Sequence, residues 1–200
     1  MTKKGQGRRS ESLPPGQSTV EQLLKWGRDH RTIGVPVPKI DLDKWNLLID
    51  GQVDEQVTLS WNDLSRLPKI ESTSDFHCVE GWSVLGLKWE GILFETIANL
   101  AKPEKTAKYV TFECADGYST SLTLKELLRE GVLLAYKLNG KYLEKGTGAP
   151  LRLVVPDKYA YKNAMWITRI TFSSEKEVGY WESRGYSDTA DVWKNDRFSE

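Results

Sequence analysis

Apolar residues in this chain come in short runs, and no run approaches the ~20 residues that a helix needs to cross a bilayer. The two clearest runs are residues 151–155 (Leu-Arg-Leu-Val-Val), followed by Pro156, and residues 166–172 (Trp-Ile-Thr-Arg-Ile-Thr-Phe). Short runs rich in β-branched and aromatic residues predict strands. Many short strands with a few scattered helices predict a mixed, β-rich α+β fold.

Turn and capping residues divide the rest of the chain into expected elements. Asp-Gly or Asn-Gly pairs at residues 50–51, 116–117 and 139–140 favour tight turns between strands. Ser60 and Thr123 each precede an acid by three residues, which is typical of a helix start. Further strands are expected over residues 45–49, 57–59, 72–79, 109–113 and 132–136. Helices are expected over 20–26, from 61 to 68, over 92–100 and from 124 to 131, and a Gly/Trp-rich loop over 81–91.

The sequence predicts one domain with a flexible N-terminal arm. Residues 1–17 are polar, contain Gly, Ser and Pro, and show no period, which predicts a loose arm. Residues 18–200 contain neither a repeat nor a linker and are expected to form the domain. A chain of 200 residues buries roughly 70% of the surface that it exposes when unfolded, so a substantial core needs no disulfides.

The overall charge and the few cysteines and histidines exclude several classes of protein. Lys plus Arg and Asp plus Glu both number 28, so the net charge is zero and no global field attracts nucleic acid or an anionic membrane. Cys78 and Cys114 are too few for a disulfide-rich secreted scaffold, and His30 and His77 too few for a His-rich zinc or di-iron centre. The basic N-terminus has no apolar segment after it, which argues against an export signal, so a cytoplasmic location is expected.

Residues 75–83, which read Asp-Phe-His-Cys-Val-Glu-Gly-Trp-Ser, are the segment best suited to chemistry. The chain lacks the serine-hydrolase elbow, the phosphate-binding loop, the dinucleotide glycine motif and the zinc-protease motif. A free cysteine is most often a small core residue, but Cys78 precedes a Gly/Trp loop. Its thiolate would serve as a soft metal ligand or as a nucleophile assisted by His77, and the residues alone leave both open.

The same segment resembles the molybdenum-ligand loop of the sulfite oxidase superfamily, and is most similar to its small single-domain bacterial members. The resemblance covers nearly the whole chain in the right order. It implies the molybdopterin-binding fold of that superfamily, an α+β domain. The matching stretches are residues 13–17, 45–51, 76–83, 89–91, 116–121, 133–135, 139–140, 148–156, 158–166 and 180–186.

The resemblance also implies which residues hold the cofactor. Cys78 matches the cysteine whose sulfur binds molybdenum beside the dithiolene of a pyranopterin. Arg152 and Lys162 match positions near the pterin and its phosphate, where an anion needs fixed donors. Asn163, Ala164 and Met165 match the family segment whose backbone closes over the cofactor.

Three positions depart from the family pattern. Thr147, expected to contact the pterin, stands where His or Asn is usual, Ala160 where Gly is common and Met165 where Lys is common. Tyr186 resembles an active-site tyrosine that would donate a hydrogen bond to the transferred oxygen, with aromatic packing as the alternative. His77 is either near the metal or hydrogen-bonded in the interior.

Ordinary structural roles compete with these assignments. Taken without the resemblance, Arg152 and Lys162 are most simply solvated charges. Cys114 is expected in the core, and His30 on the surface.

The predicted function is that of a molybdopterin-dependent oxidoreductase, which moves one oxygen atom and two electrons to or from a small substrate such as sulfite or a sulfoxide. Because the sequence has no haem-binding pair of histidines, a separate electron donor or acceptor is expected as partner. Nucleic acid and a membrane span are not expected. Two alternatives remain: a non-catalytic cofactor-binding or structural member of the same fold, and a Cys–His hydrolase.

Overall fold

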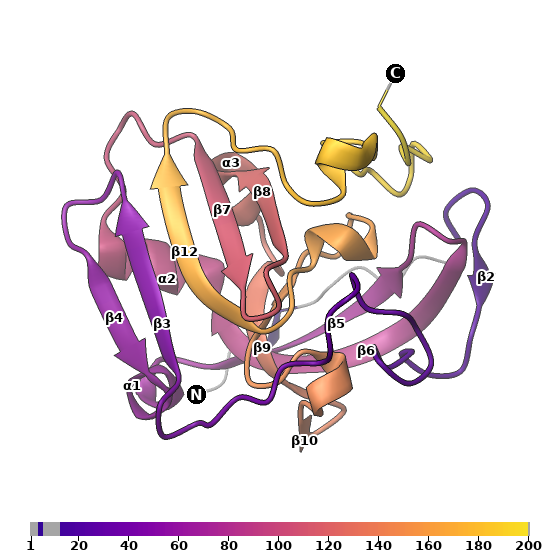
Figure 1. The fold of residues 1–200 in the computed structure, drawn as a ribbon, viewed down its shortest axis with the longest axis horizontal. Helices are drawn as coiled ribbons and strands as arrows, with labels where there is room; N and C mark the ends of the chain where they lie inside the picture. The colour runs from indigo at the N-terminus through magenta and orange to yellow at the C-terminus, as the bar shows by residue number, and fades with distance from the viewer. Residues whose placement is uncertain (1–3, 6–12, 200) are drawn as a thin grey trace.

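A computed structural model of the chain describes residues 4–5 and 13–199. Within them the strands form two sheets (Figure 1). The first runs in the order β1-β5-β6-β9-β10, with β11 on β9 and β2 on β6, and the second in the order β4-β3-β12-β7-β8. Few short helices accompany them, so the predicted α+β fold class is confirmed. The expected arm over residues 1–17 lies largely outside the described residues.

The first sheet is organised by β6, which pairs antiparallel with both β5 and β9. The prediction of a loop over residues 81–91 is wrong, because this segment has strand partners on both sides. Gly91 allows the backbones of β6 and β9 to approach closely, because a Cβ at this position would lie 2.2 Å from the carbonyl oxygen of Leu134. The strands are β1 (Lys4–Gly5), β2 (Ser18–Thr19), β5 (Ile70–His77), β6 (Trp82–Leu93), β9 (Leu133–Leu138), β10 (Lys141–Tyr142) and β11 (Arg152–Val154).

The second sheet has β12 at its centre, parallel to β3 and antiparallel to β7. All five strands fall where turn signals and apolar runs predict strands, except β8, which follows the turn at residues 116–117 and has no predicted counterpart. The strands are β3 (Asn46–Gly51), β4 (Val57–Ser60), β7 (Tyr109–Cys114), β8 (Ser119–Thr123) and β12 (Ile167–Ser173).

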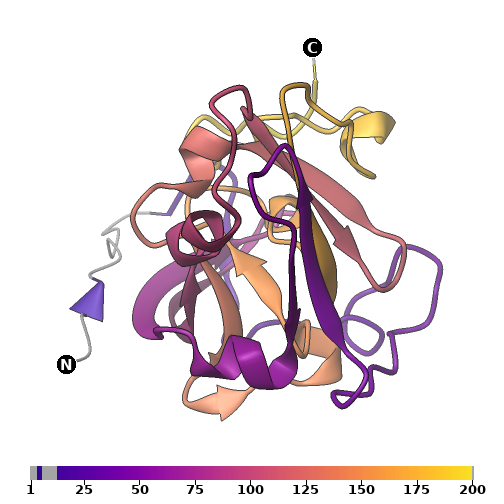
Figure 2. The ribbon, with the colours of Figure 1, turned by 90° about the vertical axis from the view of Figure 1, so that its left-hand side faces the viewer.

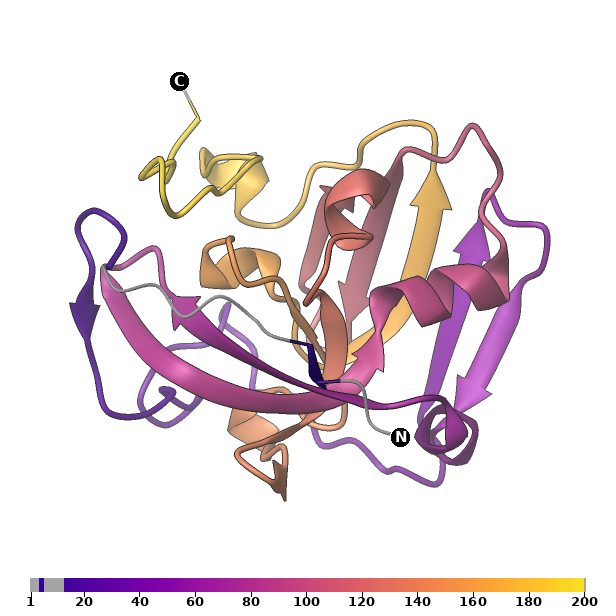
Figure 3. The ribbon, with the colours of Figure 1, turned by 180° about the vertical axis from the view of Figure 1, so that it is seen from behind.

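The helices are short and begin where the sequence provides caps. Reciprocal capping boxes start α1 (Trp61–Arg66) at Ser60 and α3 (Leu124–Leu127) at Thr123. α2 (Phe94–Ala101) starts two residues later than expected and packs on one face of the second sheet (Figures 2 and 3). There Phe94 lies 6.0 Å from Phe112 and 6.1 Å from Phe172, measured between ring centroids. The 3-10 turns are η1 (Lys145–Thr147), η2 (Ala160–Lys162) and η3 (Glu182–Arg184).

The helix expected over residues 20–26 is not formed. The N–H of Val20 donates to Ser83 O and that of Trp26 to Gly146 O, each at 2.8 Å, so the segment is extended along neighbouring chain. Gln17, in the expected arm, donates from Nε2 to Cys78 O at 3.0 Å. Backbone pairing with distant residues therefore overrides the local apolar spacing. Among the described residues, no helix has the length and apolar character of a membrane span.

Candidate active site

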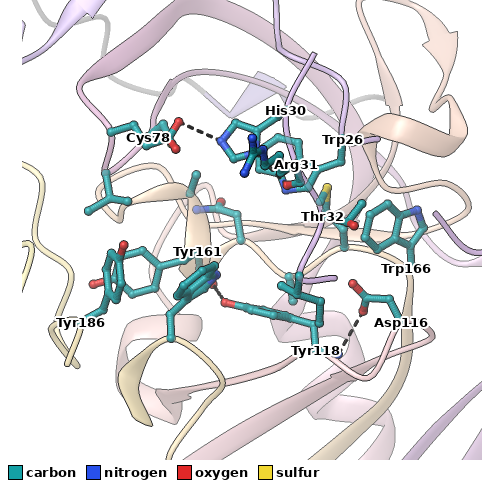
Figure 4. Close-up of a pocket in the computed structure, with 18 residues that line it drawn as sticks. Trp26, His30, Arg31, Thr32, Cys78, Asp116, Tyr118, Tyr161, Trp166 and Tyr186 are labelled. Carbon is teal, nitrogen blue, oxygen red and sulfur yellow. Dashed lines mark hydrogen bonds and ion pairs between the residues drawn. The ribbon is translucent and has the colours of Figure 1, made fainter. Parts of the chain in front are cut away.

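A cavity of about 340 Å³ lies between the two sheets (Figure 4). Four separate parts of the chain line it: residues 26–33, the turn after β5, the β7–β8 turn and residues 160–166, with Trp181 and Tyr186 from the C-terminal segment. The segments come from both sheets and from the chain outside them, so folding brings them together.

Cys78 lies in the wall of this cavity, immediately after β5. Its N–H donates to Trp82 O at 2.8 Å and its carbonyl accepts from Gly81 at 3.0 Å, so a tight turn holds it. The side chain is buried, and burial raises the pKa of the thiol to about 12. A buried thiol of this kind needs a cation beside it to become a thiolate.

His30 and Glu80 flank Cys78. His30 Nε2 lies 2.8 Å from Glu80 Oε2, and one ligand atom from each of these residues and from Cys78 lies within 4.8 Å of the others. Figure 4 shows His30 with Trp26, Arg31 and Thr32 along one side of the cavity. His30, which is expected on the surface, is half-buried and lines the cavity.

Residues 160–166 form another part of the wall, and Tyr159 just before them is bridged to His77, next to Cys78. The Asn163 amide braces this segment: Oδ1 accepts from the Val155 N–H at 2.6 Å, and Nδ2 donates to the carbonyls of Lys158 and Tyr159. Met165 lines the cavity and pairs with Arg152 in an isolated bridge. Asn163, Ala164 and Met165 all line the cavity.

Arg152 is fully buried behind this wall and is not a lining residue, so a solvated surface role is wrong. Its guanidinium carbon lies 5.2 Å from the ring centroids of both Phe76 and Trp89. Nη1 donates to Thr147 O at 3.0 Å, while Nε has no hydrogen-bond partner among the described residues. Burial lowers the pKa of Arg152 to about 9. A buried guanidinium with an unused donor and no carboxylate beside it is suited to an anion.

Lys162 is also fully buried, so a surface role is wrong here too. Its Nζ forms an ion pair with Glu182 and donates to Ser121 O at 3.0 Å. Glu182 Oε1 also accepts from Thr120 Oγ1 at 2.7 Å. Lys162 is therefore engaged within the protein and does not line the cavity.

Neither His77 nor Thr147 lines the cavity. His77 is buried, and its Nδ1 lies 2.7 Å from Ser83 Oγ. Because Ser83 Oγ donates its hydrogen to Gln17 Oε1 at 2.8 Å, Nδ1 is the donor toward Ser83. Burial lowers the pKa of His77. The Thr147 hydroxyl bonds with the backbone of Glu144, so it serves as a local cap.

Aromatic side chains and two turn residues complete the cavity. Tyr186 lines it and packs 5.5 Å from Tyr161 and 5.1 Å from Trp181, between ring centroids. Tyr118 donates from its hydroxyl to Tyr161 O, and its own N–H donates to the Asp116 carboxylate at 3.0 Å. Burial raises the pKa of Asp116.

Several lining residues are not among the site residues predicted from the sequence, although some lie within the matched stretches. The most informative are His30, Arg31, Asp116, Trp166 and Trp181, which line the cavity although no motif contains them as site residues. Trp166 has one unusual local feature, because its φ of 55° places a bulky residue in the left-handed region. Cys114, by contrast, is buried in the core as predicted.

The donor set fits a metal–pterin group with a phosphate. Cys78, a soft sulfur ligand, lines the cavity, and behind the cavity wall the buried Arg152 has a donor without a partner among the described residues. Thiolate ligation and guanidinium–phosphate recognition are the interactions that such a group requires.

Residues 34–181 match the model of the family described as "Oxidoreductase molybdopterin binding domain". The chain is 42% identical over 159 residues to the uncharacterized oxidoreductase YuiH of Bacillus subtilis, covering 80% of each protein. The family match and this relative span most of the chain.

Two further relatives carry names that refer to sulfoxides. One is the putative protein-methionine-sulfoxide reductase subunit YedZ1 of Azospira oryzae, 34% identical over 76% of this chain. The other is the protein-methionine-sulfoxide reductase catalytic subunit MsrP of Campylobacter jejuni, 32% identical over 80% of this chain. The chain spans 57% and 60% of their lengths.

The fold also occurs in a solved structure, the sulfane dehydrogenase SoxCD from Paracoccus pantotrophus. The TM-score is 0.65 at 21% sequence identity, over 70% of this chain and 41% of the SoxCD chain. This similarity concerns the fold.

Proposed function

Because this chain belongs to the family of oxidoreductase molybdopterin binding domains, we propose that it reduces a small sulfoxide to a thioether. The chain is a molybdopterin-dependent oxidoreductase, as its family and oxidoreductase relatives establish. The choice of a sulfoxide, and the residues that handle it, are proposed here from the cavity.

Cys78 would hold the metal and Arg152 the phosphate of the cofactor. When bound, the cofactor supplies the exchange of two electrons and one oxygen atom. Cys78 is fixed by its turn, while Arg152 is fixed between two aromatic rings and next to Met165. The backbone of residues 163–165 would cover the pterin, since the Asn163 side chain is already committed to bracing that segment.

The lining of the cavity favours a neutral sulfur compound over sulfite. Trp26, Trp166, Trp181, Tyr118, Tyr161 and Tyr186 supply rings, and thioether sulfur makes favourable contacts with aromatic rings. The charged lining residues are Arg31, the His30–Glu80 pair and Asp116, which leave no excess of positive charge. Sulfite is an anion and would require such an excess. This balanced, aromatic lining is the observation that carries the proposal.

Tyr186 would orient the substrate. Its phenol stands at the cavity wall, where an O–H can donate a hydrogen bond to a sulfoxide oxygen. Reduction breaks the S–O bond, consumes two electrons and two protons, and releases the thioether and water. The electrons would come from a separate protein or small donor, in line with the word "subunit" in the names of two relatives.

The hydrolase alternative in which His77 assists Cys78 has no geometric support. The Nδ1 of His77 is hydrogen-bonded to Ser83 Oγ, and His77 lies outside the cavity that Cys78 lines. A nucleophile and its base need to be within hydrogen-bond reach. The family of oxidoreductases likewise disfavours a non-catalytic role.

The test compares sulfoxides with sulfite on the cofactor-loaded chain. Methionine sulfoxide and dimethyl sulfoxide are assayed with a reduced dye as donor, and sulfite with an oxidised dye as acceptor. Sulfoxide turnover is expected to exceed sulfite turnover, and Cys78→Ser is expected to abolish both turnover and the visible sulfur-to-metal absorption, whereas Cys114→Ala keeps them. Preferred oxidation of sulfite would refute the proposed substrate, and wild-type turnover in Cys78→Ser would remove Cys78 from the metal.

A further inference from the structure

His30, Cys78 and Glu80 form a cluster with the donor types of a zinc site. One ligand atom from each residue lies within 4.8 Å of the others. A tetrahedral zinc site with bonds of about 2.0–2.3 Å separates its ligand atoms by roughly 3.3–3.8 Å. Small side-chain rotations therefore suffice to bring the three atoms onto one cation.

The hydrogen bonds of His30 leave its Nε2 directed at the cluster. Nδ1 lies 2.9 Å from the carbonyl oxygen of Arg31, which only accepts, so Nδ1 carries a hydrogen. Nε2 lies 2.8 Å from Glu80 Oε2. With Nδ1–H donating to a backbone carbonyl, the Nε2 lone pair is the one that can serve a metal as ligand.

The cluster is also held in place by neighbours that are not ligands. The His30 ring stacks on Trp26, with ring centroids 4.6 Å apart. Trp82 Nε1 donates to Glu80 Oε2 at 3.3 Å. Cys78 and Glu80 share one turn, closed by the hydrogen bond from Cys78 N to Trp82 O. Outer contacts of this kind orient ligands in metal sites.

From this geometry we infer that the chain without its cofactor binds a divalent cation of the zinc class through Cys78 Sγ, His30 Nε2 and a Glu80 carboxylate oxygen. Thiolate, imidazole and carboxylate are the ligands that zinc takes, and the open cavity leaves a fourth position for water. Because Cys78 is also the proposed ligand of molybdenum, the cation and the cofactor compete for one sulfur. Only this competition rests on the proposed function.

Co²⁺ is the probe for the site, because it accepts the ligands of zinc and reports thiolate ligation in its absorption spectrum. The full chain, produced in a host that does not make the cofactor, is titrated with Co²⁺ and then with Zn²⁺. A saturable thiolate-to-cobalt band that Zn²⁺ removes is expected. His30→Ala, Glu80→Gln and Cys78→Ser should each weaken binding by more than roughly 100-fold, since even outer contacts are worth about 10- to 100-fold.

Two control variants separate the cluster from the rest of the cavity and from general thiol binding. Cys114→Ala removes the other cysteine and Asp116→Asn removes a lining carboxylate outside the cluster, and both should bind Co²⁺ as the unmodified chain does. Circular dichroism checks that every variant folds. If His30→Ala does not fold, His30→Gln tests the site in its place. Unchanged affinity in folded His30 and Glu80 variants, or a spectrum without a thiolate band, overturns the inference.

Loading the zinc-bound chain with cofactor tests the competition separately. Slower cofactor uptake that a chelator restores supports a shared sulfur. Retention of zinc and cofactor together overturns the competition and, with it, the assignment of Cys78 to molybdenum, while the Co²⁺ titration still decides the cation site.

Discussion

Arg152 and Lys162 are both fully buried cations, but their surroundings differ. Lys162 has Glu182 as an ion-pair partner. Arg152 donates to the Thr147 carbonyl and lies between two rings, with no acidic partner among the described side chains. Removing one member of a buried ion pair leaves the other charge buried without a partner, whereas removing an unpaired buried charge leaves no such charge behind.

Methionine substitutions at these two residues should therefore have unequal costs in the cofactor-free chain. Lys162→Met is expected to lower the free energy of unfolding by about 3–5 kcal/mol, because Glu182 is left buried and unpaired. Arg152→Met is expected to cost less than about 1.5 kcal/mol, the usual net worth of one hydrogen bond. Urea unfolding measures both.

Cofactor affinity should depend strongly on Arg152 even though stability does not. If Arg152 holds the phosphate, Arg152→Met weakens cofactor binding by about 2 kcal/mol or more, roughly 30-fold. A large loss of stability in the cofactor-free Arg152→Met variant, with unchanged cofactor retention, would show that its guanidinium is structural.

Asp116 makes stability depend on pH in a direction that can be checked. Burial raises its pKa above the ordinary value of 3.8, so the folded state binds this proton more tightly than the unfolded state. The contribution of Asp116 to the free energy of unfolding is fully present below pH 3.8 and is lost as the pH rises through the pKa of the folded state. Asp116→Asn should thus gain stability over the unmodified chain between about pH 4 and pH 7.

Asp63 is the control for that measurement, because its hydrogen bonds with Ser60 lower its pKa. The contribution of Asp63 to the free energy of unfolding is present above the ordinary pKa of aspartate and is lost as the pH falls through the lowered pKa of the folded state. Asp63→Asn should lose stability at neutral pH relative to acid pH. The free energy of unfolding from urea titrations at several pH values gives both signs, and parallel curves for the two variants would contradict the Asp116 prediction.

At the scale of elements, the pairing of β6 with β9 depends on a residue without a side chain. A Cβ at Gly91 would lie 2.2 Å from Leu134 O and 2.7 Å from the Ala135 Cα, both backbone atoms that cannot turn away. Gly91→Ala is expected to cost about 3 kcal/mol or more in the free energy of unfolding, at or above the upper end of the usual range for overpacking.

Gly117→Ala is the matched control for that substitution. A Cβ at Gly117 would meet nothing within 4 Å beyond its chain neighbours, but the φ of 82° is unfavourable for alanine. A cost of about 1–2 kcal/mol is therefore expected. Equal thermal or urea midpoints for the two alanine variants would show that the β6–β9 strands separate easily at Gly91.

Local rules predict the elements whose cause is local. The capping boxes at Ser60 and Thr123 start α1 and α3, because both partners of each box lie within one turn. β6 escapes such rules because its residues 82–93 are stabilised by β5 and β9, and Gly and Trp residues hide the alternation. The segment 20–26 has helical spacing, but its backbone groups pair with Ser83 and Gly146. Pairing across long sequence separations is what the single sequence does not reveal.

The same limit applies to the candidate site. Cys78 and residues 163–165 stand out through the family resemblance, and all of them line the cavity. His30 is brought to Cys78 only by the folding of residues 25–30 against the chain near Gly146, so no spacing within the sequence indicates it. Arg152 is buried because β11 pairs with β9 and the guanidinium lies against the rings of Phe76 and Trp89.

At the scale of the whole molecule, residues 16–17 and Arg197, which are far apart in the sequence, meet at the turn that carries Cys78. Arg197 donates from Nη1 to Val79 O at 2.7 Å and from Nη2 to Gly16 O at 3.0 Å. Gln17 adds its bond to Cys78 O. The N-terminal and C-terminal segments therefore fix the backbone beside the cavity, although neither belongs to a long strand or helix.

A ligand in this cavity would touch both sheets at once. Cys78 follows β5 of the first sheet, whereas Asp116 and Tyr118 belong to the β7–β8 turn of the second, and all three line the cavity. A group that binds only the folded state stabilises it by RT ln(1 + [L]/Kd), about 4.1 kcal/mol when its concentration is roughly 1,000 times Kd.

Cofactor loading should consequently raise the thermal midpoint of the whole chain in one cooperative transition. For a domain of this size about 4 kcal/mol corresponds to a shift of roughly 8–16 °C. Scanning calorimetry of loaded and cofactor-free chain measures the shift, and Arg152→Met should reduce it. Identical midpoints, or a loaded chain in which the two sheets melt separately, would mean that the cofactor does not bridge them, since a ligand bound to only one sheet leaves the other with its original stability.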